Sequence, residues 1–125
     1  KVSMVSVTGS RDRGPSPSAK CVLNGVGVLH KERALMTFRF LWGVGANEPG
    51  LVKNLYPPVQ AGDPEWRSYY TVNLLNLPNH YHNGGIWPFV GGMWVRYIYK
   101  LGMKGLARRE LLRLAELCSR GVSHK

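Results

Sequence analysis

Apolar side chains recur with the 3.6-residue period of an α-helix in three separate stretches of the chain. The first stretch runs from about His30 to Trp42. Its apolar positions follow one another at helical spacing, at Ala34, Leu35, Phe38 and Leu41. Gly43 and Gly45 come directly afterwards, and glycine is the residue that most readily ends a helix. The pattern therefore predicts one helix over His30 to Trp42.

Two more helices are predicted in the second half, from Pro88 to about Leu101 and from about Leu106 to Arg120. Pro88 suits the first turn of a helix, where its missing N–H is not needed. The apolar positions of the earlier helix are Ile86, Val90, Met93, Tyr97 and Leu101, widened by Phe89, Trp94 and Ile98. Those of the later helix are Ala107, Leu111, Leu114 and Cys118. The break at Gly102 to Gly105 is short, which predicts an antiparallel αα-hairpin.

Smaller features add detail to this hairpin. Gly91 and Gly92 each weaken a helix by about 1 kcal/mol relative to alanine, so we expect a neighbouring segment to press close against both. The acidic Glu110 and Glu116 are expected on a polar, exposed face. Glu116 and Arg120 have the spacing of an ion pair on that face.

Residues 44–76 connect the first helix to the hairpin and are rich in turn-forming prolines and glycines. Val72 to Leu77 is expected to be a short extended segment. A connection this long is uncommon in a compact domain unless it is functional. Residues 1–20 are polar and rich in Ser, Pro and Gly, so we expect a disordered tail. The predicted fold class is all-α: an αα-hairpin, one further helix and a long loop.

Residues 79–89 hold the candidate chemistry, because they bring rings and amides together before two glycines. Aromatic faces can cover the C–H side of a sugar, and imidazole and carboxamide groups can bond its hydroxyls. Such a segment, which includes His80, Tyr81, His82, Asn83 and Trp87, is typical of the rim of a sugar pocket. Trp66 and Arg67 lie on the long loop, where a ring can stack on a sugar and a guanidinium can bond its hydroxyls. His80 and His82 lack a third ligand at suitable spacing, so no metal site is predicted.

The run LNLPNHYHNGGIWPFVGGMWV resembles a motif of the six-hairpin (α/α)6-barrel glycoside hydrolases, of the glycogen-debranching (amylo-α-1,6-glucosidase) and neutral invertase type. LYPPVQAGDPEWRSYYTVN and LARRELLRLAEL are similar to the segments around it, so the resemblance covers about residues 30–120. It implies that residues 21–125 are part of such a barrel, because the whole barrel is several times longer. It also implies hydrolysis of α-glucosidic linkages, with this segment lining the sugar pocket. The matching positions that would line the pocket are first Tyr81, His82, Asn83 and Trp87, and next Trp66, Arg67 and His80.

Glycoside hydrolysis ordinarily requires two carboxyl groups. In the family that this chain resembles, the acid lies on an earlier hairpin and the base beyond the last helix, so no catalytic residue is assigned here and the chain by itself is expected to be inactive. Of the acidic residues, Glu65 alone lies among plausible sugar contacts. No cofactor is expected for this chemistry.

Composition and charge leave other functions open. The formal charge is +10, but the basic residues are spread along the chain, which disfavours a nucleic-acid partner. Two distant cysteines, no recognisable signal peptide and no apolar run of about 18 residues predict a cytoplasmic protein without a membrane partner. The alternatives are a sucrose-cleaving, neutral invertase-like enzyme, a non-catalytic carbohydrate-binding fragment and a basic nucleic-acid-binding protein. We also expect self-association through apolar helix faces left exposed around Trp94 and Leu114.

Overall fold

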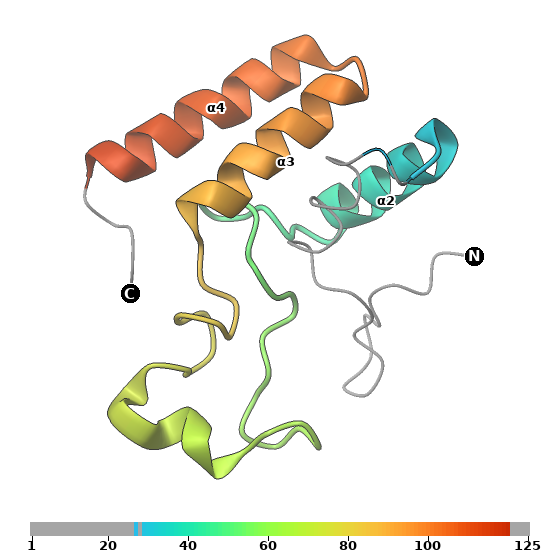
Figure 1. Ribbon diagram of the computed structural model, residues 1–125. Helices are drawn as coiled ribbons and strands as arrows, with labels where there is room; N and C mark the ends of the chain where they lie inside the picture. Colours follow the sequence, from blue (N-terminus) through green and yellow to red (C-terminus); the bar gives the residue numbers. More distant parts are fainter. Residues whose placement is uncertain (1–26, 28, 121–125) are drawn as a thin grey trace.

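A computed structural model of the chain describes residue 27 and residues 29–120, and in this part the fold is all-α. Its elements are the α-helices α2 (Lys31–Gly43), α3 (Pro88–Lys100) and α4 (Lys104–Ser119) and the 3-10 helix η1 (Ser68–Leu74), with no strand among the described residues. Figure 1 shows α3 and α4 side by side as a hairpin, with α2 beside α3. The predicted tail, residues 1–20, and Cys21 lie outside the described residues.

All three predicted helices are confirmed, with small shifts at their ends. α2 ends where the N–H groups of Val44 and Gly45 reach back to the last turn, and Gly45 has a φ of 72°. α3 begins at Pro88, as predicted. α4 begins at Lys104, two residues earlier than predicted, because Gly102 alone reverses the chain with a φ of 89°. Gly105 therefore lies inside α4.

The α3–α4 hairpin is closed around one of the two adjacent glycines. A Cβ on Gly91 would lie 2.3 Å from Leu51 Cδ2, closer than real Cβ contacts come, and 3.1 Å from Leu114 Cδ1, which is a tight contact. The expected close approach is therefore confirmed at Gly91. It is wrong at Gly92, where an added Cβ would meet open space.

Aromatic rings from α2 and α3 form the centre of the core. The rings of Phe38 and Trp94 stack with centroids 5.5 Å apart, and the Tyr97 hydroxyl donates a 2.6 Å hydrogen bond to the Ala34 carbonyl. Trp94 and Tyr97 are fully buried. The expectation of an exposed apolar face around Trp94 is wrong, because α2 and the following loop cover it.

The predicted apolar stripes are wrong at three positions and the predicted polar face at one. Phe89, Leu111 and Cys118 are exposed, while Glu110 has no exposed surface. Glu110 points into the protein because hydrogen-bond donors lie there. Its carboxylate accepts hydrogen bonds from Trp94, Asn47 and Arg113. The predicted Glu116–Arg120 ion pair on the exposed face is confirmed.

A long arm, residues 53–87, extends away from the helices (Figure 1). Its two sides are joined at the base by a bridge between Lys53 and Ile86 and by a 3.0 Å bond from Asn54 N–H to the Gly85 carbonyl. The expected extended segment over Val72–Leu77 is wrong, because η1 occupies Ser68–Leu74. Local i to i+3 bonds, such as Tyr70 N–H to the Arg67 carbonyl at 2.9 Å, favour this tighter turn.

No helix in the described part of the chain is long and apolar enough to cross a membrane.

Candidate functional site

A tight turn at residues 79–85 positions the rings of the candidate site. Asn79 N–H donates to the Asn83 carbonyl at 2.7 Å, and Asn83 N–H donates to the His80 carbonyl at 2.8 Å. Asn79 and Tyr81 take positive φ values of 68° and 40°, which are uncommon outside glycine. A Cβ on Gly85 would lie only 2.5 Å from the Tyr81 carbonyl oxygen, so this position requires glycine.

The Tyr81 carbonyl oxygen fixes the orientation of Trp87. It accepts hydrogen bonds from Gly85 N–H and Trp87 Nε1, both at 3.1 Å, and from Asn54 Nδ2 at 3.2 Å. These bonds join the turn, the start of α3 and the opposite side of the arm. Trp87 is thus held by its polar edge, and its ring lies against the neighbouring rings.

Tyr81, His82 and Trp87, three of the predicted sugar contacts, form one cluster of rings. The His82 ring lies 4.1 Å from the Tyr81 ring and 5.0 Å from the Trp87 ring, centroid to centroid. Tyr81 and His82 are exposed, while Trp87 is half-buried. Phe89 extends the cluster at 6.0 Å from Trp87, although its helical spacing had predicted a core position.

Asn83 serves the fold of the arm more than it serves a ligand. Its Oδ1 accepts from Val59 N–H at 2.7 Å, and its Nδ2 donates to the carbonyls of Val59 at 2.9 Å and Asn76 at 3.0 Å. The side chain is buried between the two sides of the arm. The Asn83 amide thus joins the two sides of the arm, and both of its polar atoms are hydrogen-bonded to backbone groups.

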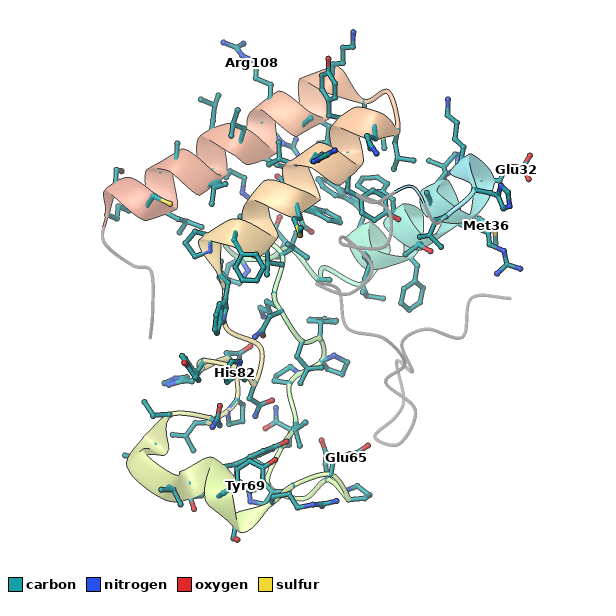
Figure 2. The ribbon with its side chains drawn as sticks, viewed as in Figure 1. Glu32, Met36, Glu65, Tyr69, His82 and Arg108 are labelled. Carbon is teal, nitrogen blue, oxygen red and sulfur yellow. The ribbon has the colours of Figure 1, made fainter. Side chains whose placement is uncertain are left out.

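A hollow of about 210 Å³ lies within the arm beside His82. Its walls come from both sides of the arm and from η1, and its lining residues are Leu55, Tyr69, Tyr70, Asn76, His82 and Asn83. Figure 2 shows Tyr69 on η1 and His82 on the returning side of the arm. The hollow is smaller than the roughly 300–1,000 Å³ clefts that take drug-sized ligands, which suits a single sugar ring.

Asn76 carries a buried acceptor at the wall of this hollow. Its Oδ1 has no hydrogen-bond partner among the described residues. An unpaired buried acceptor costs about 1–3 kcal/mol. The sequence offered no signal for Asn76 or Leu55, because nothing in a loop's sequence shows which of its residues will face each other.

The other three residues predicted to contact a sugar, Trp66, Arg67 and His80, lie outside the lining of the hollow. Trp66 packs edge-on against Tyr70 at 5.1 Å and so supports the wall. Arg67 donates to the carbonyls of Pro64 and Trp66 at 2.7 and 3.0 Å, which holds its own loop. His80 is exposed and does not line the hollow.

Lys53 lies at the base of the arm, close to the turn. Its Nζ donates to Asn79 Oδ1 at 3.2 Å and lies 5.6 Å from the centroid of the Tyr56 ring. Partial burial lowers the pKa of Lys53 below its ordinary value. The positive charge of Lys53 therefore carries a desolvation cost at this position.

The acidic residues of the described part do not form a catalytic pair in the hollow. Glu110 and Glu48 both bond Arg113 in the helical part, and neither lines the hollow. Glu65 lies in the outer half of the arm (Figure 2) but is not among the lining residues either. No group of three His, Cys, Asp or Glu side chains that could hold a metal occurs within residues 29–120.

Comparisons of the chain with models of protein families, with curated proteins and with solved structures find no match.

Proposed function

We propose that the chain is a part of an (α/α)6-barrel glycoside hydrolase of the glycogen-debranching type, and that its arm forms one wall of the site for an α-glucoside. The observation that supports this most is the hollow in which Tyr69, Tyr70 and His82 line the same space as Asn76. Rings that cover C–H surfaces beside polar groups that bond hydroxyls are what a pyranose requires. The helices α3 and α4 would be one hairpin of the barrel.

The charge distribution supports a neutral ligand over a nucleic acid. The arm holds Lys53 and Arg67 against Asp63 and Glu65, so its formal charges balance. The chain's excess of basic residues lies outside the arm, and Figure 2 shows Arg108 pointing outward from α4, away from the arm. A nucleic-acid site would place cations beside the rings, because phosphate contacts supply most of its affinity.

Two of the basic side chains that a nucleic acid would use are already occupied. Arg113 bonds Glu110 and Glu48, and the guanidinium of Arg109 lies 5.4 Å from the centroid of the Trp42 ring. Burial by itself would lower the pKa of Arg113, but the hydrogen bonds and charges of the two glutamates outweigh it and raise that pKa. These arginines stabilise the helical part.

In the intact enzyme, the acid and base that cleave the glycosidic bond would lie on other hairpins. The arm would bind and orient the sugar and exclude water from it. Cys118, an exposed free thiol, is compatible with the reducing cytoplasm that we propose as the compartment.

The test is titration calorimetry of the purified chain with glucose, maltose and sucrose. We expect saturable binding that is lost in His82→Ala, because His82 lines the hollow, and retained in His80→Ala, because His80 does not. Absence of binding to every sugar, in a sample whose helical circular dichroism spectrum shows that it is folded, would contradict the proposal. Equal loss in both histidine variants would place the sugar elsewhere.

A further inference from the structure

The exposed side of α4 carries side chains at the spacing of a helix–helix contact. Residues at alternating intervals of four and three form one line along the helix, and all of them are exposed: Lys104, Arg108, Leu111, Ala115 and Cys118. We call these five residues the outer seam. Side chains at this spacing share one face of a helix, and a line of this kind is how one helix packs along another.

The outer seam is basic at its beginning and apolar towards its end. Leu111 is 50% exposed and its neighbour Leu112 is 59% exposed, although the helical pattern had predicted a buried Leu111. Arg108 lies about one turn before Leu111 and points away from the arm (Figure 2). Lys104 lies one turn earlier still, with its Nζ 5.7 Å from the centroid of the exposed Tyr99 ring of α3.

The cations of the outer seam are not neutralised within residues 29–120. The ion pairs of this part of the chain join Arg113 to Glu48 and Glu110 and Arg120 to Glu116, and none includes a residue of the seam. The seam therefore presents positive charge and apolar surface side by side. A partner that fits it must supply both negative charge and apolar groups.

The charge of the chain indicates that this partner is another molecule. A second copy would bring the same cations to the same face, and each copy has a formal charge of +10. Residues 1–20 hold four basic residues against one acidic residue, so they do not supply the negative charge either. A nucleic acid would offer phosphates to the cations but nothing apolar to Leu111 and Leu112.

We propose that the outer seam is a docking site for an acidic amphipathic helix of a second protein. The apolar side chains of that helix pack on Leu111 and Ala115, and its carboxylates pair with Lys104 and Arg108. Because the cations lie at one end of the seam, they also set the direction in which the partner helix lies. The inference does not rest on the proposed function, since no residue of the seam belongs to the arm.

The experiment measures the binding of fluorescein-labelled peptides to the full chain by fluorescence anisotropy. One helical peptide carries leucines at intervals of four and three residues with glutamates beside them. A second peptide has the same composition in scrambled order, so that it has no apolar face. We expect saturable binding of the first peptide, weaker binding of the second, and a loss of affinity as salt concentration rises.

Two substitutions test the two ends of the seam. Leu111→Ala should weaken binding of the amphipathic peptide about three- to tenfold, because it removes apolar contact. Arg108→Gln should weaken it about two- to fivefold, the size of an exposed ion pair. The matched controls are Val72→Ala on η1 and Arg39→Gln on α2, which change exposed residues far from the seam and should leave binding unchanged. Circular dichroism checks that each variant is folded.

Three outcomes would overturn the inference. Equal binding of the two peptides would show attraction by charge alone, and unchanged binding in Leu111→Ala would place the peptide elsewhere. If anionic phospholipid vesicles bind the chain through Leu111 and Arg108 while neither peptide binds, the inferred class of partner is wrong. The sugar titrations are independent of these outcomes, because both tested residues lie outside the arm.

Discussion

The indole Nε1 of Trp94 donates a 2.9 Å hydrogen bond to Oε2 of Glu110, and both side chains are fully buried. The same oxygen accepts from Asn47 Nδ2 at 3.2 Å, while the other carboxylate oxygen accepts from Arg113 at 2.8 Å. Arg113 also donates to the carbonyls of Asn47 and Pro49. One carboxylate therefore connects α3, α4 and the loop after α2.

Replacing Glu110 with alanine is expected to lower the free energy of unfolding by about 3 kcal/mol or more. The substitution leaves the indole N–H, the Asn47 amide and a guanidinium without their common acceptor. Glu110→Gln should cost less, about 1–3 kcal/mol, because the amide oxygen can still accept from Trp94. Urea unfolding followed by circular dichroism measures both. Glu116→Ala, on the exposed face, is the control, and an equal loss there would show that burial of Glu110 is not the cause.

Gly91 and Gly92 are expected to respond to alanine in opposite directions. At Gly91 the new methyl group would overlap Leu51 and press on Leu114, which should destabilise the protein by about 1–3 kcal/mol. At Gly92 the methyl group meets open space in an exposed helix, so alanine should stabilise by up to about 1 kcal/mol. Thermal unfolding of the two variants measures both changes in stability. Destabilisation by both would mean that the outer face of α3 is covered.

The Asn83 amide is expected to hold the arm closed. Asn83→Asp keeps an acceptor for Val59 N–H but sets a carboxylate oxygen against the carbonyls of Val59 and Asn76. We expect a loss of about 1–3 kcal/mol and faster proteolytic cleavage within the arm. Asn79→Asp is the matched control, since aspartate also accepts from Lys53 and tolerates the positive φ. Equal rates of cleavage in the two variants would show that the Asn83 amide does not hold the arm closed.

Lys53 is expected to make the free energy of unfolding depend on pH in the alkaline range. Burial lowers the pKa of Lys53 in the folded state, so between that pKa and the ordinary value of 10.5 the unfolded state binds more protons. The free energy of unfolding should therefore rise with pH across this range, relative to Lys53→Met, which has no titrating group. Chemical unfolding of both proteins at several pH values between 8 and 11 measures the difference. A constant difference between them would contradict the lowered pKa.

Much of the fold and part of the site could be predicted from the sequence. The spacing of Ala34, Phe38 and Leu41 and the position of Pro88 located the helices to within two residues, because local periodicity and chain stereochemistry are properties of neighbours in sequence. Tyr81, His82 and Trp87 were grouped for the same reason, since they are close in the chain and a tight turn keeps them close in space.

Only the tertiary structure decided which faces are buried and which residues share a hollow. Glu110 lies inside and Phe89 outside, against the helical pattern, because the donors on Trp94, Asn47 and Arg113 and the approach of Leu51 to Gly91 fix the rotation of the hairpin. Tyr69 and His82 likewise meet across the arm through bonds that Asn83 makes to a distant part of the chain. Such contacts depend on how separate segments pack, and packing is determined by all the segments together.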